Sequence, residues 1–192
     1  MIGTYQQLVT AVQDYSLRSD APVDLFIRLA ESDIAPFLIH YRAETEATIN
    51  INSGNSITIP ADHIKTRAIA VDGVTPTPVG IFDNKVYHDQ ITYYQSGNQL
   101  NFRSANPMSK ATIAYYARVP ALTATANTNW LLTHFPSVYL YGVLARLYKW
   151  AKDAEAEADA KASMMEAINA LLEDHKQGTA VTNPVQREVT HW

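Results

Sequence analysis

The 192-residue sequence contains no cysteine and only seven glycines. Without cysteine the chain can form neither disulfides nor thiolate zinc sites. Hydrophobic residues make up 47% of the sequence and charged residues 18%, which favours an ordered globular chain over a disordered one. A chain of this length buries roughly 70% of its unfolded surface, enough for one main core with an elaboration. We therefore expect packing or assembly, rather than covalent cross-links, to stabilise the fold.

Positive charge and long apolar runs are also scarce. Lys and Arg number 15 against 19 Asp and Glu, giving a net charge of −4. This balance disfavours tight, non-specific binding to a nucleic-acid backbone, although DNA could still pass close by. No segment approaches the about 18 uninterrupted apolar residues of a membrane helix. The first ten residues also lack the cationic start and apolar run of a signal peptide, so neither membrane insertion nor secretion is expected.

Helical periodicity marks the N-terminal part of the chain. Within residues 4–18, apolar residues recur at helical spacing and predict a first helix. Ser19 or Asp20 then supplies a cap for a second helix, expected to run from Val23 to about Tyr41. Pro36 should kink this second helix, because proline removes one backbone hydrogen bond. The apolar residues of the first helix are Tyr5, Leu8, Val9, Val12 and Tyr15.

From Ala47 the pattern changes to short runs of β-branched and aromatic residues separated by glycine-containing turns. This predicts an antiparallel β region of five or six strands over residues 47–119. The clearest hairpin signal is Tyr93–Phe102, where "QSGN" contains the glycine that such a turn needs.

The C-terminal part is again helical, starting at Phe135 and Pro136 and stopping at Gly178. Two apolar stripes are expected to pack inward. The fold class is therefore α+β: a helical bundle of about four helices from residues 1–46 and 120–177, an inserted antiparallel β domain at 47–119, and an extended C-terminal arm at 178–192. The stripes are Leu140, Val143, Leu144, Leu147 and Ala151, and then Ala158, Ala162, Met165, Asn169 and Leu172.

Motifs for catalysis or metal binding are missing. The six histidines have none of the i, i+3 or i+4 spacings that place two ligands on one helix face. Nucleophile motifs and phosphate loops are also lacking. The local group Asp83, His88 and Asp89 is flanked by turn residues, which indicates a solvated loop. No catalytic residue, metal or cofactor is expected.

Four carboxylates follow one another in "KDAEAEADAK": Asp153, Glu155, Glu157 and Asp159. Like charges four residues apart weaken an isolated helix by a few tenths of a kcal/mol, roughly. Two interpretations stay open: an ordinary solvated helix face, or a face that lines a negatively charged channel.

The stretch from Thr128 to Trp150 is dense in aromatic residues but contains only two cations, Arg146 and Lys149. Stacking on single-stranded nucleic acid would require more interleaved Lys and Arg, so a packed helix is the better interpretation. Its aromatic residues are expected to pack on the first helices and against neighbouring subunits, because such side chains are typical of protein interfaces. They are Tyr139, Tyr141, Tyr148 and Trp150.

Taken in order, these segments resemble the adaptor, or head completion, proteins of tailed-phage head-to-tail connectors. The resemblance covers roughly residues 4–175 and rests on segments beginning at Tyr5, Ile59 and Thr128. After "LAE" the sequence has "SDIAPFLIH", where members of the family tend to have basic residues. The matching residues are Tyr5, Leu8, Ser19, Asp20, Phe26, Ile27, Leu29, Ala30, Glu31, Pro60, Ala61, Asp62, Asn129, Pro136, Tyr139 and Leu140.

This resemblance implies a structural virion protein at the head–tail interface, assembled in the host cytoplasm. Its expected partners are further copies of itself in a ring of twelve, the portal protein, and a tail or nozzle protein. Double-stranded DNA would pass through the channel without sequence-specific binding. A portal-binding role is expected for the C-terminal arm, and a channel-facing role for the acidic helix. The arm residues concerned are Pro184, Val185, Arg187, Val189 and Trp192.

Two alternatives come from other classes of protein. The first is a phage structural enzyme that hydrolyses cell-wall glycan through Glu44 or Glu46, expected near the end of the second helix. The second is a protein-binding module unrelated to phages, whose β region recognises its partner.

Overall fold

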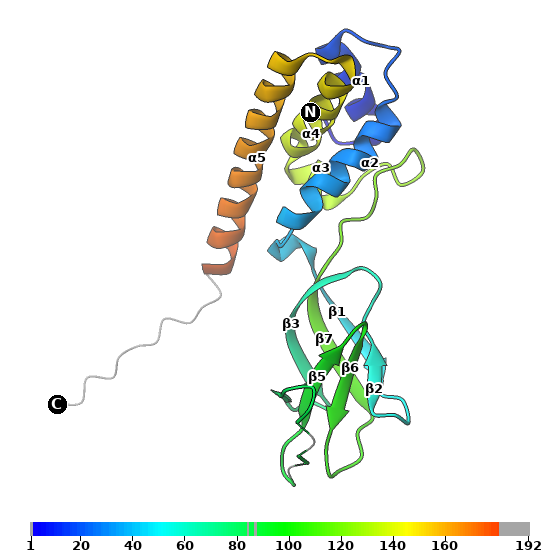
Figure 1. The fold of residues 1–192 in the computed structure, drawn as a ribbon, viewed down its shortest axis with the longest axis vertical. Coiled ribbons are helices and arrows are strands. Elements are labelled where there is room, and N and C mark those ends of the chain that lie inside the picture. Colours follow the sequence, from blue (N-terminus) through cyan, green and yellow to red (C-terminus); the bar gives the residue numbers. More distant parts are fainter. Residues whose placement is uncertain (1, 84, 87, 181–192) are drawn as a thin grey trace, which may run out of the picture. The chain divides into compact units, whose positions relative to one another are not determined.

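The computed structural model describes residues 2–83, 85–86 and 88–180. They form two compact units, each with its own hydrophobic cluster (Figure 1). The helical unit contains the described residues up to Ala43 and from Val119 onward, and the β unit is Glu44–Arg118. The predicted α+β fold class is confirmed.

The first helix, α1, is Tyr5–Ser16, as the periodicity predicts. Its N-cap is Thr4, whose hydroxyl accepts a hydrogen bond from the Gln7 backbone amide at 3.3 Å. The second helix, α2, begins at Val23 as predicted, but the cap predicted at Ser19 or Asp20 is wrong. Asp20 instead binds Arg18, with 3.1 Å between Arg18 Nε and Asp20 Oδ1, and no side chain caps α2.

The second helix is shorter than predicted. It is Val23–Ile34, followed by the 3₁₀ turn η1, Ala35–Phe37, and, after three further residues, the 3₁₀ turn η2, Tyr41–Ala43. Pro36 has no N–H to donate, so the α-helical hydrogen-bond pattern cannot continue through it. The Leu38 amide instead bonds to the Ala35 carbonyl at 3.2 Å, which tightens the chain into a 3₁₀ turn.

Three further helices complete this unit: α3, Trp130–His134, α4, Pro136–Ala151, and α5, Ala154–Ala180. The start at Pro136 agrees with the prediction. Lys152 ends α4 in a left-handed conformation, with φ of 60°, and α5 then packs against α4. The Asp153 carboxylate accepts from the Ala156 amide at 3.1 Å and so caps α5.

Gly178, the predicted helix stop, lies inside α5. Its role is close packing rather than termination. A Cβ atom built on Gly178 would lie 2.5 Å from Cε1 of Tyr41, so only glycine leaves room for that ring.

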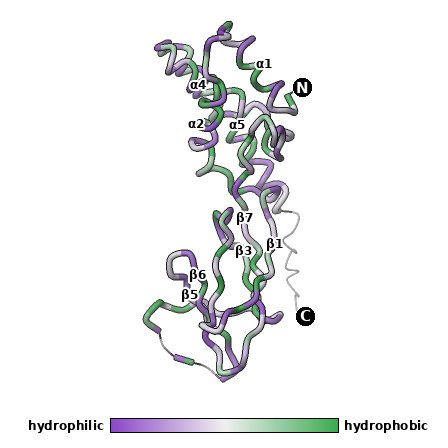
Figure 2. Tube along the Cα trace, turned by 90° about the vertical axis from the view of Figure 1, so that its right-hand side faces the viewer, coloured by the Kyte–Doolittle hydropathy of each residue, from purple (hydrophilic) through white to green (hydrophobic). Residues whose placement is uncertain are grey.

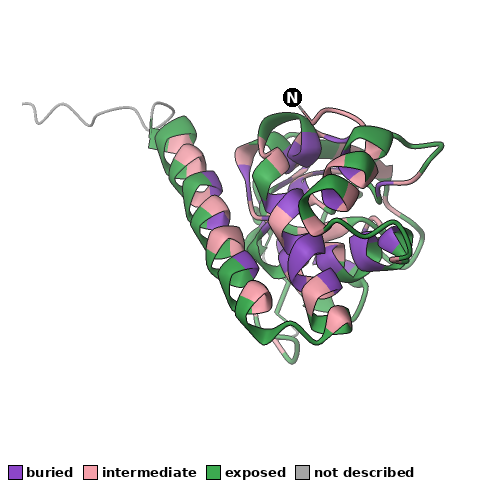
Figure 3. Cartoon of the chain, turned by 90° about the horizontal axis from the view of Figure 1, so that it is seen from above, coloured by how far each residue is buried: buried purple, intermediate pink, exposed green. Residues whose placement is uncertain are grey.

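The stripe predicted to bury α5 is mostly wrong. Its first four residues, Ala158, Ala162, Met165 and Asn169, are exposed, and Leu172 is half-buried. The residues that α5 buries are Ala160, Ile168 and Leu171, on the side that faces the other helices (Figure 3). Because the break at Lys152 separates α5 from α4, the contact with α4 sets the phase of α5, and its bulkiest branched residues take the inner side.

The described residues of the β unit form seven strands in two sheets, one or two more strands than predicted, and the unit begins at Glu44 rather than Ala47. The sheets have the orders β1-β7-β3 and β2-β6-β5-β4, and all pairs are antiparallel except β4 with β5. The strands are β1 Glu44–Asn50, β2 Ser56–Thr58, β3 His63–Val71, β4 Thr77–Pro78, β5 Thr92–Ser96, β6 Gln99–Arg103 and β7 Lys110–Ala117.

The predicted hairpin is confirmed as β5 and β6, joined by Gly97 and Asn98. Gly97 has φ of 56°, a left-handed conformation that glycine adopts without strain. Burial alternates over the last three residues of β3 (labelled in Figure 2): Ile69 and Val71 are buried and Ala70 between them is half-buried, so one face of the strand packs inward. Residues of both sheets form one cluster: Ile57, Ile59, Ile69, Val71, Leu100, Phe102, Ala111, Ile113 and Tyr115.

Candidate functional site

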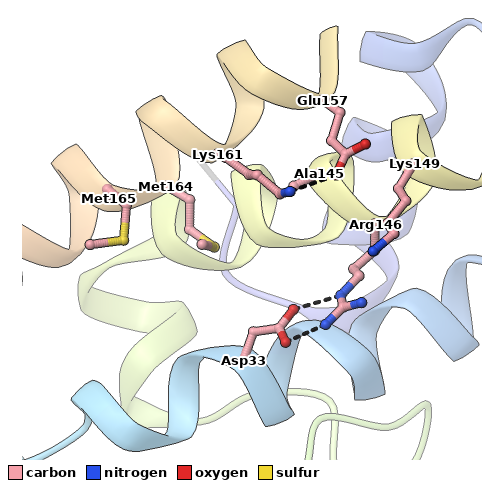
Figure 4. Close-up of a pocket in the computed structure, with 8 residues that line it drawn as sticks. All are labelled: Asp33, Ala145, Arg146, Lys149, Glu157, Lys161, Met164 and Met165. Atoms are coloured by element: carbon pink, nitrogen blue, oxygen red, sulfur yellow. Dashed lines mark hydrogen bonds and ion pairs between the residues drawn. The ribbon is translucent and has the colours of Figure 1, made fainter. Parts of the chain in front are cut away.

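An open pocket of about 300 Å³ lies between α2, α4 and α5 of the helical unit (Figure 4). Asp33 of α2 and Arg146 of α4 form a two-bonded ion pair, with 2.6 Å between Arg146 Nε and Asp33 Oδ2. This carboxylate raises the pKa of Arg146. On α5, Lys161 Nζ lies 2.6 Å from Glu157 Oε1 and lowers the pKa of that carboxyl group. The remaining lining residues are Ala145, Lys149, Met164 and Met165.

The pocket is suited to binding rather than to chemistry. Ala145, Met164 and Met165 give it an apolar surface, and methionine adapts readily to different partners. Its charged groups are mostly paired with one another, and none of the lining residues is a serine, cysteine or histidine that could act as a nucleophile or base.

A buried polar network holds the aromatic helix α4 to its neighbours. Asn129 Nδ2 donates to Tyr139 Oη at 2.8 Å, and Tyr139 Oη donates to Glu31 Oε1 at 2.9 Å. The same Glu31 oxygen accepts from the Leu122 amide at 2.7 Å, and Asn129 also caps α3. The resemblance matched Glu31 in one segment and both Asn129 and Tyr139 in another, and the fold brings the three together.

This network corrects one predicted interface residue. The Tyr139 side chain is fully buried inside the helical unit, and this burial raises its pKa. Its ring and hydroxyl therefore serve the core and have no surface to offer another subunit.

The other predicted interface residues lie nearer the surface. Tyr141 and Tyr148 are half-buried, and Trp150 is 44% exposed at the end of α4. The Arg18 guanidinium lies 5.1 Å from the Trp150 ring centre. Leu17, in a left-handed conformation, is 91% exposed. No local pattern identifies this exposed leucine, because it follows the last periodic residue of α1.

The four carboxylates of the predicted acidic helix do not share one face. Asp153 caps the helix and Glu157 lines the pocket, whereas Glu155 and Asp159 are exposed and form no ion pair with another described residue. Side chains two apart project about 200° apart on a helix, so the 155/157 pair cannot face the same way.

A histidine cluster surrounds η2, the last turn before the β unit begins. His40 is fully buried, and its Nδ1 accepts from the Arg42 amide at 3.2 Å. The preceding amide, that of Tyr41, donates to His175 Nδ1 at 3.1 Å. His40 Nε2 lies 3.2 Å from Asp174 Oδ2, and the Trp130 ring stacks on the imidazole with centres 5.2 Å apart. Burial, the largest cause, lowers the pKa of His40.

Sequence reasoning missed this cluster, because its histidines come from distant segments. The group is nevertheless not a metal site, since no set of three histidines, aspartates or glutamates among the described residues is arranged to hold a metal ion.

The residues of the hydrolase hypothesis lie elsewhere than expected. Glu44 and Glu46 belong to strand β1 and not to a helix end, and Glu44 is paired with Arg67. His88 and Asp89 are exposed, in agreement with a solvated loop. In the same loop, the Asp83 amide bonds to the Gly80 carbonyl at 2.9 Å, and this turn exposes 92% of Phe82.

The proposed arm residues Pro184, Val185, Arg187, Val189 and Trp192 lie outside the described part of the chain. Within the described part, no helix is both long enough and apolar enough to cross a membrane.

The chain is similar to a known protein family. The family described as "SU10 adaptor protein" matches residues 3–188, nearly the whole chain. No curated protein matches the sequence.

Proposed function

Because the chain belongs to the SU10 adaptor protein family, a family of phage structural adaptors, we propose that it forms a ring on the portal after DNA packaging. The observation that carries this proposal is the family match over residues 3–188, which spans both units. In this role the ring extends the DNA channel and offers an attachment surface to tail or nozzle proteins. Twelve copies at −4 each give a ring charge of roughly −48, a consequence of cyclic assembly.

We propose positions for the channel and the partner surfaces on the basis of charge and exposure. Glu155 and Asp159 are the members of the acidic segment with free carboxylates, so we assign them, rather than Asp153 and Glu157, to the channel. Negative charge along a channel limits the adhesion of DNA in transit. The tip residue Phe82 of the β unit supplies an apolar contact for a partner protein.

Portal binding is assigned to the arm beyond α5, with Val185, Val189 and Trp192 as apolar anchors and Arg187 as a charged contact. The structure sharpens the deletion that tests this assignment. Gly178 belongs to α5 and contacts Tyr41, so a deletion from Gly178 would damage the helical unit, whereas a deletion of residues 181–192 leaves α5 intact.

The experiment is electron microscopy of the full chain mixed with purified portal rings, beside the chain that ends at Ala180. We expect an added ring layer on the portal with the full chain and none with the shortened chain, which should remain folded by circular dichroism. Unchanged portal binding by the shortened chain would overturn the arm assignment. Failure of the full chain to bind would overturn the proposed function itself.

A further inference from the structure

Helix α2 has an apolar outer face that nothing in the described chain covers. Leu25 is 53% exposed and Leu29 is 38% exposed, and Arg28 lies between them. These residues are neighbours on one helix face because they are separated by three and four positions. Arg28 is exposed and forms no hydrogen bond or ion pair with another described residue. An exposed apolar patch rimmed by polar residues is typical of a protein interaction site.

Helix α5 has a second uncovered face. Ala158, Ala162 and Asn169 are exposed at helical spacing, and Met165, 40% exposed, lies beside them at the edge of the pocket (Figure 4). Glu166 borders this face and, like Arg28, has no hydrogen bond or ion pair within the described residues. The residues of this face recur at helical spacing, although no other described residue of the chain buries them.

Within one chain the two faces do not bury each other, since Leu25, Leu29 and the α5 residues stay exposed. Both α2 and α5 pack on α4, and each turns its exposed face away from that contact. The view in Figure 1 places α5 and α2 on different sides of α4, and Figure 3 shows α5 along one flank with its exposed residues outward.

We propose that the outer face of α2 in one copy packs against the outer face of α5 in the next copy. Leu25 and Leu29 fill the space beside the small Ala158 and Ala162, and Arg28 pairs with Glu166. Such a contact joins two different patches, so repeating it closes a ring when the rotation between copies allows. Glu155 and Asp159 lie beside this face, so α5 can contact its neighbour while those carboxylates face the channel.

The occupant is a second copy rather than another protein because both halves of the contact are present on this chain. Their charges are opposite and both unpaired, and one face carries large side chains where the other carries small ones. This inference rests on the ring-forming part of the proposed function and names the surfaces that build the ring.

Charge reversal tests the contact. We expect Arg28→Glu and Glu166→Arg each to lower the yield of rings on the portal at least about tenfold, as loss of about 1.4 kcal/mol per contact would do. The double variant Arg28→Glu/Glu166→Arg should recover at least half of the wild-type yield, because every interface then regains an opposite pair. Lys65→Glu and Glu46→Arg, exposed positions of the β unit, make the same charge changes as controls and should leave ring yield unchanged.

The absence of cysteine permits a second measurement. A Leu29→Cys/Met165→Cys chain, treated with a short bismaleimide on the portal, should give a ladder of covalent oligomers, whereas either single variant should not.

This interface would be overturned if the single charge reversals left the ring yield intact. It would also be overturned if the double variant formed as few rings as the single variants. If the wild-type chain forms no ring at all, the proposed function fails first, so the two failures can be told apart.

Discussion

In the helical unit 21 hydrophobic residues form the buried cluster of the described chain, whereas the cluster of the β unit contains nine. The larger cluster encloses polar groups, namely Asn129 and His40. The β unit also buries two polar residues, Ser56 and Thr92, but it has further polar contacts at exposed turns. For example, Asp72 accepts from the Ser109 amide at 2.8 Å and from the Lys110 amide at 3.2 Å.

The two units are stabilised in different ways. A large apolar core can bury hydrogen-bonded polar groups, which fixes how the helices meet but makes each buried group costly to disturb. A β unit with a smaller core relies on the hydrogen bonds between its strands and on its turn residues. Its solvent-exposed hydrogen bonds contribute less to stability. Substitutions in one unit should therefore change the stability of that unit and leave the other unchanged.

The largest effect should come from Leu147→Ala, since Leu147 is fully buried in the helical unit. We expect the free energy of unfolding of that unit to fall by about 2–5 kcal/mol. The matched change is Ile113→Ala, fully buried in the β unit. Hydrogen exchange followed by mass spectrometry should show faster exchange only in the unit that carries the substitution. Equal acceleration in both units would mean that they unfold as one and that the comparison has no energetic basis.

Much of the fold could be predicted because its signals are local. The periodicity of α1, the start at Pro136 and the Gly97 hairpin depend only on neighbouring residues. The end of α2 was placed too far along the chain, because the periodic apolar residues continue past Pro36 while the hydrogen-bond pattern does not.

The candidate site could be predicted only in part, because it is built from distant segments. The aromatic residues of α4 were recognised, but which of them face the core depends on packing. Tyr139 is buried by partners on α2 and before α3, Glu31 and Asn129, that no local pattern identifies. The phase of α5 was misjudged for the same reason, since alanine occurs on both of its faces.

A smaller effect is expected from Tyr139→Phe, which removes one hydroxyl from the network with Asn129 and Glu31. The loss should be about 1–3 kcal/mol, because both partners stay buried or half-buried with one bond fewer. Tyr141→Phe on the same helix is the control and should change stability by less than about 0.5 kcal/mol. Urea unfolding measured by tryptophan fluorescence compares the two. Similar losses for both variants would show that the network adds nothing beyond the ring.

Gly178→Ala tests the contact between α5 and η2 near the end of the helical unit. The new methyl group would lie 2.5 Å from Tyr41 Cε1, so the ring or the helix end must move. We expect a loss of about 1 kcal/mol, at the low end for overpacking, because a helix end yields more easily than a core. The double variant Gly178→Ala/Tyr41→Ala should be no less stable than Tyr41→Ala alone in thermal unfolding. A further loss in the double variant would place the strain elsewhere.

The smallest effect is a difference in acid sensitivity between the units. Burial lowers the pKa of His40 in the helical unit and of His63 in the β unit below the ordinary value of 6.5. The unfolded chain then binds more protons than the folded one, so this stability is present above about pH 6.5 and is lost as the pH falls below it. His40 is fully buried and His63 only half-buried, so the helical unit should lose more.

His40→Gln isolates this contribution in the helical unit. Its amide oxygen can still accept from the Arg42 amide, but the side chain no longer titrates. Between about pH 6.5 and 5, the range below the ordinary histidine pKa, the variant should lose less stability than the wild type. Hydrogen exchange near η2 measures the effect, and His63→Gln, which alters only the β unit, is the control. If lowering the pH speeds hydrogen exchange of the Tyr41 and Arg42 amides equally in the wild type and in His40→Gln, protonation of His40 does not set the acid sensitivity of this turn.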